Sequence, residues 1–416
     1  MEKQFEHTGF WFLPDCDTNK IAGVLTYSPV SGILLKLIGA FKDLELGTIW
    51  GEVDNGKQVT LCGAFMTDRS GSFTTYTQSQ IRGNSLFIGV WFKDIADLRI
   101  YGAMFKCLYA NTWNNHSGLN STMTSVKPVK INVTGENPPI VLLNLTATLS
   151  CKLKTVLTKN LNRHPETTIS LVEKHYFELI SKTGLSFNQT VTNVFHLVNF
   201  LTLCIQNESF IQELKINFKL KGQRNIVYST HVYFNLPSVP EFKPNIHHSN
   251  MLLPYRDLEN NLEVVMQEWF AILDKVRPSL IPYTANYYSR YDYVSDKFLN
   301  MTASMEAYHR DFINPREIHF KDRVKDLLVR SKGIYKRTLK IGDLEALAKE
   351  IKDRRNDWTH SNPIIISNKN STRIHRLTEI IKLVMACTYL QTIGVDKKIL
   401  KRNVESSNTY KTFKLK

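Results

Sequence analysis

The spacing of apolar residues changes near residue 240, and this change limits the folds open to the chain. Before that point, short apolar runs alternate with turn residues, as in residues 21–28 and 58–65, which predicts antiparallel strands. Beyond residue 250, apolar residues recur every three or four positions, which predicts amphipathic helices. We therefore expect an α+β multidomain chain, with a β-rich N-terminal region of sandwich-like antiparallel sheets followed by an all-α helical bundle.

Local signals refine this expectation in the β-rich region. Asp54-Asn55-Gly56 separates two strand-like runs, and Asn-Gly favours a type I′ hairpin turn, in which both central residues have positive φ. Strands at this spacing indicate an antiparallel sandwich or a barrel-like sheet. Residues 190–206 are an exception, because their apolar period predicts a single helix.

The helical part contains several separate apolar stripes. They begin near residues 258, 298, 320, 344 and 374, and Asp343 is a candidate N-cap for the fourth. Four or five helices with short connections predict a bundle.

Prolines mark the boundary between the two parts. Residues 237–250 contain three prolines and no apolar period, as expected of a linker. The predicted ranges are 1–240 for a β-rich region that is one unit or two subdomains dividing near 135–165, 241–251 for the linker, 252–395 for the helical domain and 396–416 for a basic C-terminal tail.

The chain is basic, with 53 Lys and Arg against 38 Asp and Glu and a net charge of +15. Residues 251–416 hold 30 of these basic and 20 of these acidic residues, so the excess is denser in the helical part. Two explanations of this positive charge stay open: it makes the surface soluble, or it attracts a polyanion such as RNA.

Cysteine spacing and missing motifs exclude several classes of protein. The six cysteines are scattered without metal-ligand spacing, so we expect reduced thiols and neither a metal site nor a cofactor. The sequence has no P-loop, dinucleotide-binding, zinc-protease or nucleophile-elbow motif. The N-terminus lacks a signal peptide, and the apolar runs 32–41 and 193–206 are too short to span a membrane, so we expect a cytoplasmic protein without a membrane partner.

Arg355 and His360 lie at and just beyond the end of the fourth predicted helix. A helical wheel places Arg355 between Ala348 and Ile351 on the apolar face, where a charged side chain is costly unless it is paired. His360 would face away from Arg355 in a continuous helix, so we expect the helix to end before it, close to the Ser-Asn-Pro sequence that follows. His360 can then fold back beside Arg355.

A second Arg-Asn pair with a following His lies in the β-rich region, at Arg224-Asn225 and His231. Side chains alternate along a strand, so the odd separation puts Arg224 and His231 on opposite faces. We therefore favour Arg355 and His360 as the functional pair.

An Arg and a His placed together suit phosphodiester cleavage. His titrates near neutrality and can move a proton to or from a ribose 2′-hydroxyl or a leaving oxygen. Arg stays charged and can hold the phosphate through two hydrogen bonds as negative charge develops. Because the nucleophile is the RNA's own 2′-hydroxyl, the reaction requires no metal. The pair is therefore suited to cleavage of an RNA phosphodiester without a metal.

The sequence RNDWTH at 355–360 resembles the signature of the HEPN superfamily of ribonucleases, which is Arg, a polar residue, a few residues and His. The β-rich region, with GFWFLPD, KIAGVLTYSPVSGILLKLIG and IWGEV, is similar to the N-terminal domain of ApeA-type proteins. These are bacterial anti-phage factors with a C-terminal HEPN domain. The HEPN resemblance covers roughly residues 252–395, and the ApeA-like resemblance extends over nearly the whole chain.

The resemblance implies a metal-independent endoribonuclease of the abortive-infection type that cleaves RNA, with tRNA as the expected substrate. It implies a sensor or regulatory role for the β-rich region, residues 1–240. It implies a homodimer through the HEPN domains, in which both Arg/His sets line one cleft. By matching position, Arg355 and His360 would be catalytic and Asn356 supporting. Glu306 matches an acidic position on an earlier HEPN helix, where it either pairs with Arg355 or is a surface carboxylate.

Basic residues around the motif are candidates for RNA binding, with a solvated face as the default explanation. The basic stretch from 321 to 340 comes first among them. The residues nearest the motif are Arg354, Lys352, Lys369 and Arg373.

Two other functions stay open. The helical domain would then be a non-catalytic HEPN interaction module, although a scaffold has no need of His360. Alternatively, the β-rich region would be the working part, as a sensor of a ligand or of a phage-derived trigger. No ligand-specific motif distinguishes these possibilities in the sequence.

Overall fold

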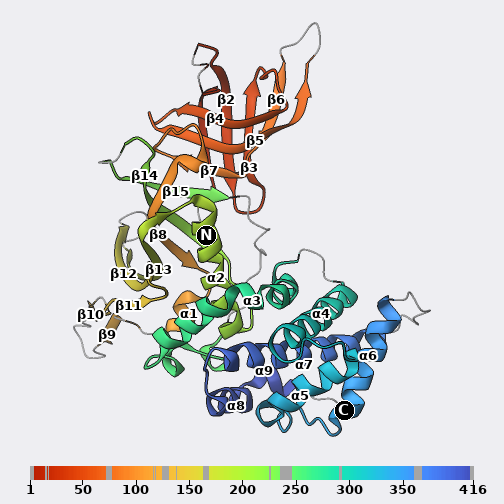
Figure 1. Ribbon diagram of the computed structural model, residues 1–416. Coiled ribbons are helices and arrows are strands. Elements are labelled where there is room, and N and C mark those ends of the chain that lie inside the picture. Colours follow the sequence, from red (N-terminus) through yellow and green to blue (C-terminus); the bar gives the residue numbers. More distant parts are fainter. Residues whose placement is uncertain are drawn as a thin grey trace.

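The computed structural model describes residues 4–412, apart from 15, 17, 72–76, 116, 118, 124–130, 137, 163–167, 224–225, 235–245, 290–292 and 360–367. A β-rich part, red to yellow-green in Figure 1, precedes a helical part in teal and blue. The predicted order of a β-rich region followed by a helical bundle is confirmed.

Six strands at the start of the chain form a closed antiparallel barrel. It closes because the long strand β5 pairs with β4 along one edge and with both β6 and β7 along the other. Trp11, Leu25 and Ile33 are fully buried in its core. Of the two sheet arrangements that the strand spacing indicated, this part is therefore the barrel. Its strands are β1 (Phe5–Phe12), β2 (Ile21–Ser28), β3 (Gly32–Ile38), β4 (Glu45–Val53), β5 (Gln58–Ser70) and β6 (Gln78–Arg82).

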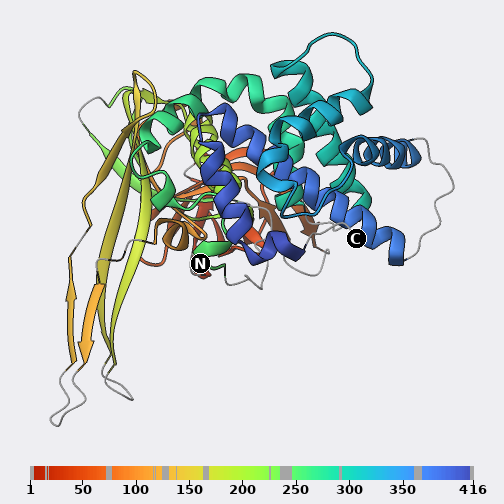
Figure 2. The same cartoon turned by 90° about the horizontal axis from the view of Figure 1, so that it is seen from below.

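The sheet continues beyond the barrel as an open antiparallel sheet instead of a second sandwich layer. In spatial order its strands are β7 (Ser85–Ile88), β15 (Tyr228–Phe234), β14 (Ile211–Leu220), β8 (Leu98–Cys107), β13 (Thr168–Leu185), β12 (Leu149–Asn162) and β11 (Val141–Asn144). The barrel core ends at β7, whereas β11 and β12, which lie within 135–165, belong to the open part of the sheet. Figure 2 shows the β12–β13 hairpin projecting from the body beside a small sheet of β9 (Leu119–Met123) and β10 (Ile131–Gly135).

The predicted hairpin between β4 and β5 is present, but the predicted turn type is wrong. Gly56 has a φ of +74°, whereas Asn55 is not among the residues with positive φ. The Gly56 N–H donates to the Val53 carbonyl, and the Lys57 N–H donates to the Asn55 side chain. A longer loop with one left-handed glycine therefore replaces the two-residue type I′ turn.

Every predicted helical stripe lies on a helix, apart from Leu258 at the start of the first stripe, which precedes its helix. The helix expected at 190–206 is α2 (Phe187–Ile205), which begins with a Ser186/Gln189 capping box. The Asp343 carboxylate accepts from the Glu345 N–H, so its N-cap role is confirmed. The other helices are α1 (Ala110–Asn114), α3 (Leu262–Tyr288), α4 (Val294–Phe312), α5 (Phe320–Tyr335), α6 (Leu344–Thr359), α7 (Asn368–Thr392), α8 (Lys397–Ser406) and α9 (Asn408–Thr412), with short 3-10 turns η1 (Ile95–Asp97), η2 (His248–Asn250) and η3 (Tyr255–Asp257).

The predicted basic tail contains α8 and α9, and both helices pack on the protein. Leu400, Val404 and Tyr410 are buried, and Asn403 donates to the Leu252 carbonyl at 2.9 Å. None of the described helices combines the length and the apolar character that crossing a membrane requires.

One hydrophobic core joins the open sheet to the helical bundle. Trp113 of α1 donates to the Leu253 carbonyl at 2.9 Å, and Trp269 of α3 donates to the His196 carbonyl of α2 at 3.0 Å. Residues 241–245 of the predicted linker lie outside the described residues, and its last residue, Met251, is buried in this core. The predicted domain ranges stay a prediction.

Five of the six cysteines are buried, and all six are free thiols, as expected for core residues. The described residues contain no group of three or more His, Cys, Asp or Glu side chains placed to hold a metal ion.

Candidate active site

The candidate site lies where α4, α5 and α6 meet, on the right of the helical part in Figure 1. Leu347, Ala348 and Ile351 bury one face of α6 in the bundle core. Arg355 follows on the same face, one turn after Ile351, and its side chain is 28% exposed. The helix therefore turns Arg355 toward the bundle, as predicted. Its guanidinium stays partly exposed, so a ligand can reach it.

Two side chains hold the Arg355 guanidinium. Its Nη2 donates to Glu306 Oε2 of α4 at 2.8 Å. Its planar group also lies over the ring of Phe320, the first residue of α5, at 4.2 Å from the ring centroid. The Glu306 carboxylate neutralises the positive charge of Arg355, and the face of the Phe320 ring attracts it. The arginine therefore has the partners that a charged side chain on an apolar helix face requires. Of the two alternatives for Glu306, the pairing with Arg355 is the one present.

A buried polar network supports this arrangement one helical turn away. Arg323 of α5 is 6% exposed and donates to His309 Nδ1 of α4 at 3.0 Å. The opposite nitrogen, Nε2 of His309, lies 3.0 Å from Asp326 Oδ2. Because Arg323 only donates, Nδ1 must accept and Nε2 must carry the proton. Burial lowers the pKa of His309, which keeps it neutral, while Asp326 opposes that shift.

Arg323 also closes the connection between α4 and α5. Its guanidinium donates to the carbonyls of Asn314 and Arg316 at 2.9 and 2.7 Å. The network therefore fixes how α4 presents Glu306 and how α5 presents Phe320.

Ion pairs tie α6 to its neighbours. Lys321 and Lys325 of α5 contact Glu345 of α6 at 2.8 and 2.5 Å, and their hydrogen bonds lower the pKa of Glu345 to about 2. Arg373 of α7 binds Glu350 through two hydrogen bonds at 2.8 and 2.6 Å, which raise the pKa of Arg373.

The residues predicted to bind RNA are mostly paired with acids. Arg373 is committed to Glu350. Lys352 contacts the neighbouring Asp353 at 2.8 Å, and Arg354 lies 4.0 Å from Asp357. The Lys369 side chain lies outside the described residues. These residues therefore offer little uncompensated positive charge.

The second half of the predicted catalytic pair, His360, lies outside the described residues. The described part of α6 extends through Thr359, whose hydroxyl donates back to the Arg355 carbonyl. Asn356 is half-buried on α6 next to Arg355. The structure thus brings Arg355 and Glu306 together, and the relation of His360 to them stays a prediction.

Phe320 and the Arg323 network are absent from the sequence-based prediction of the site. Both are far from Arg355 along the chain, so no sequence spacing connects them with it. The only available signal was Arg323 itself, a charged residue beside the apolar stripe of its helix, which calls for a partner in the same way as Arg355.

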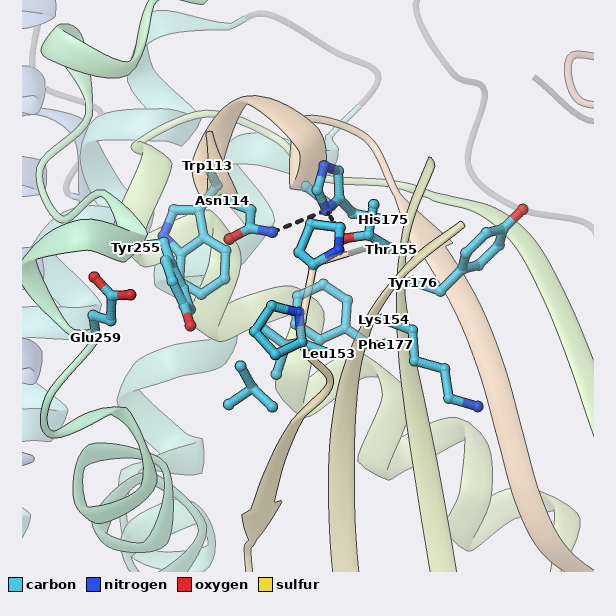
Figure 3. A pocket seen from close by; sticks show the side chains of 14 residues that line it. Trp113, Asn114, Leu153, Lys154, Thr155, His175, Tyr176, Phe177, Tyr255 and Glu259 are labelled. Atoms are coloured by element: carbon cyan, nitrogen blue, oxygen red, sulfur yellow. Dashed lines mark hydrogen bonds between the residues drawn. The ribbon is translucent and has the colours of Figure 1, made fainter. Parts of the chain in front are cut away.

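A cavity of about 100 Å³ lies on the other side of the molecule, between the open sheet and the start of the helical part. Figure 3 shows Trp113, Phe177 and Tyr255 among its walls. At one end, Asn114 and Thr155 both lie within 3.0 Å of His175 Nδ1. Tyr255 and Glu259 come from the segment that precedes α3, and the other walls come from the β-rich part, so all of the lining residues lie between Ala110 and Glu259.

Two family models match the chain. ApeA N-terminal domain 1 matches residues 6–269, more than half of the chain, and Apea-like HEPN matches residues 299–399. The second match contains α5, α6 and α7 and most of α4, and therefore the candidate site. Comparisons with curated proteins and with solved structures gave no match.

Proposed function

Because the chain belongs to the ApeA-like family of anti-phage proteins with a C-terminal HEPN nuclease domain, we propose that it is a metal-independent endoribonuclease that acts through Arg355 and His360. The observation that carries this proposal is the held and partly exposed guanidinium of Arg355, five residues before the histidine of the motif. A guanidinium fixed by Glu306 and Phe320 is ready to bind a phosphate without further ordering.

The proposed reaction uses only groups of the protein and of the RNA. His360 accepts the proton of a ribose 2′-hydroxyl, and that oxygen attacks the adjacent phosphorus. Arg355 binds the phosphate oxygens while their charge increases. The bond from phosphorus to the 5′-oxygen then breaks, the leaving oxygen takes up a proton, and the products carry a 2′,3′-cyclic phosphate and a 5′-hydroxyl.

A homodimer through the HEPN domain completes the proposal. In such a dimer a second imidazole is available to protonate the leaving 5′-oxygen, which departs on the side of the phosphorus opposite the attacking 2′-oxygen. We propose tRNA as the substrate and the cytoplasm as the location, where that substrate is found. Asn356, beside Arg355 on α6, is assigned a supporting role at the scissile phosphate.

Cleavage of bulk tRNA by the purified full chain tests the catalytic pair. Arg355→Ala is expected to lower the rate by about 10² to 10³-fold, through the loss of charge stabilisation. His360→Ala is expected to lower it by about 10² to 10⁴-fold, through the loss of proton transfer. Both rates are measured in EDTA, which should leave wild-type cleavage unchanged.

Arg376→Ala and His375→Ala, on α7, are the matched controls and should cleave as the wild type does. Equal cleavage by the wild type and both Arg355 and His360 variants would contradict the nuclease mechanism. Full phage protection by His360→Ala would instead favour the non-catalytic interaction module.

The cavity favours a second role, in which the N-terminal region senses a phage-derived trigger. All of its lining residues lie within the part of the chain that ApeA N-terminal domain 1 matches. Tyr255 and Glu259 come from the segment that leads into α3, so an occupant there contacts the open sheet and the entry to the helical part together. Thr155→Leu fills the cavity and removes one hydroxyl contact to His175. Thr158→Leu, on the same strand but outside the cavity lining, is its control.

We expect Thr155→Leu to lose phage protection in a plaque assay while the purified protein keeps its thermal midpoint and its basal RNA cleavage. Thr158→Leu should protect as the wild type does. Full protection by Thr155→Leu would rule out this cavity as the trigger site.

A further inference from the structure

The predicted basic stretch from 321 to 340 separates into two parts in the structure. In its first half, Lys321 and Lys325 are paired with Glu345, and Arg330 is paired with Asp326. Arg323 is buried in its network with His309. This half is therefore electrostatically compensated and holds helices together.

The second half remains exposed and uncompensated. Among the described residues, no acidic side chain pairs with Lys332, Lys336, Arg337 or Lys340. They occupy the last turn of α5 and the turn after it, a segment that contains no acidic residue.

The tertiary structure adds cations from a distant part of the chain. Helix α8 packs on α5, and Lys397 Nζ lies 3.5 Å from the Arg330 carbonyl of α5. Lys398 follows it and is exposed. The acidic neighbour Asp396 is engaged at the N-terminus of α8, where it accepts from the Lys398 N–H. The α5–α8 basic surface, as we call it, consists of Lys332, Lys336, Arg337, Lys340, Lys397 and Lys398.

We propose that the α5–α8 basic surface binds the phosphate backbone of the RNA substrate, apart from the site of cleavage. This rests on the proposed ribonuclease function. A polyanion such as RNA binds best to exposed cations without acidic partners, because these cations neutralise its phosphates and release the counterions bound there. The residues around the motif are poorer candidates, since their charges are already paired.

The position of the surface determines the kind of RNA that it can serve. Phe320, which contacts Arg355, begins α5, and Lys336 directly follows its last residue, so the two lie about 24 Å apart along the helix axis. A dinucleotide is too short to touch both places, whereas a folded RNA such as tRNA can reach both. The surface therefore selects long RNA and leaves the chemistry at Arg355 unchanged.

RNA binding by the full chain tests the proposal. The variant changes Lys332, Lys336, Arg337 and Lys340 to Gln, in an Arg355→Ala background so that the probe, labelled bulk tRNA, stays intact. We expect Kd to rise about 10-fold or more at low salt. The slope of log Kd against log salt should fall by about one for each phosphate that the variant no longer neutralises.

The matched control changes four exposed lysines of the β-rich part to Gln, namely Lys42, Lys57, Lys182 and Lys221. It removes the same charge and should keep the wild-type Kd and slope. An unchanged Kd for the α5–α8 variant, or an equal loss in the control, would overturn the proposal.

Cleavage assays separate this proposal from the proposed function. With Arg355 intact, the α5–α8 variant should show a raised KM for tRNA and an unchanged kcat/KM for the dinucleotide UpA. An equal loss on both substrates would contradict a remote binding surface. If Arg355→Ala cleaves as the wild type does, the catalytic assignment fails, while the binding result stands on its own.

Discussion

Phe320, an apolar residue, determines how the charged side chain of Arg355 is oriented. Its ring covers one face of the Arg355 guanidinium, while Glu306 binds Nη2. A cation over an aromatic face gains about 0.5–1 kcal/mol at an exposed site and more where water is excluded. The ring therefore restricts the plane in which the remaining N–H groups can meet a phosphate.

At this scale we predict that Phe320→Leu lowers kcat for RNA cleavage about fivefold, because the leucine fills the space without attracting the guanidinium. Phe320→Tyr should restore the rate, since it keeps the ring face. The measurement is kcat and KM on tRNA.

Phe312→Leu is the matched control, since Phe312 also lies under a cation, Lys275, at 4.5 Å but is not in contact with Arg355. Its kcat should equal that of the wild type. A leucine variant of Phe320 with wild-type kcat would show that packing alone positions Arg355.

Between elements, the α4–α5 connection depends on one buried arginine. Arg323 donates hydrogen bonds to His309 and to the carbonyls of Asn314 and Arg316. Among the described residues, no other donor binds these two carbonyls. A buried polar group that loses its hydrogen-bond partner destabilises the folded protein by the full free energy of its desolvation.

We predict that Arg323→Met lowers the free energy of unfolding by about 3 kcal/mol, because it leaves these acceptors unpaired. Urea denaturation followed by circular dichroism measures the change. Arg330→Met on the same helix removes only the exposed pair with Asp326 and should cost about 0.5 kcal/mol. Equal midpoints for the two variants would contradict a structural role for the buried network.

Across the whole molecule, the open sheet and the helical part share one core, within which α2 packs on α3. His196 of α2 lies in this contact, near Asp274 and Arg277 of α3. Burial, with a contribution from Arg277, lowers its pKa to about 4, against the opposing effect of Asp274.

This shift predicts a pH dependence of stability. Below about pH 6.5 the unfolded chain binds a proton at His196, whereas the folded chain stays neutral there until about pH 4. The free energy of unfolding should therefore fall as the pH is lowered through this window, by about 2 kcal/mol after allowance for partial exposure.

His196→Gln should reduce that loss of stability between pH 7 and pH 5, measured by urea denaturation. His375→Gln, an exposed histidine of α7, should follow the wild-type curve. Identical curves for the wild type and His196→Gln would mean that His196 is solvated in the folded protein.

The sequence by itself determined the element types, because the apolar period of 2 or 3.6 is a local property of strands and helices. It also determined that Arg355 needed a partner, since its place on the apolar stripe follows from the helical repeat alone. The same reasoning allowed a barrel but could not select it, because closure depends on how β5 divides one edge between β6 and β7.

Only the tertiary structure decided what surrounds the site. Glu306, Phe320 and Arg355 come from three helices, and pairing between helices is set by packing of the whole core and not by any local repeat. The same holds for the basic residues, whose charges the fold pairs near the motif and leaves unpaired where α8 meets the end of α5.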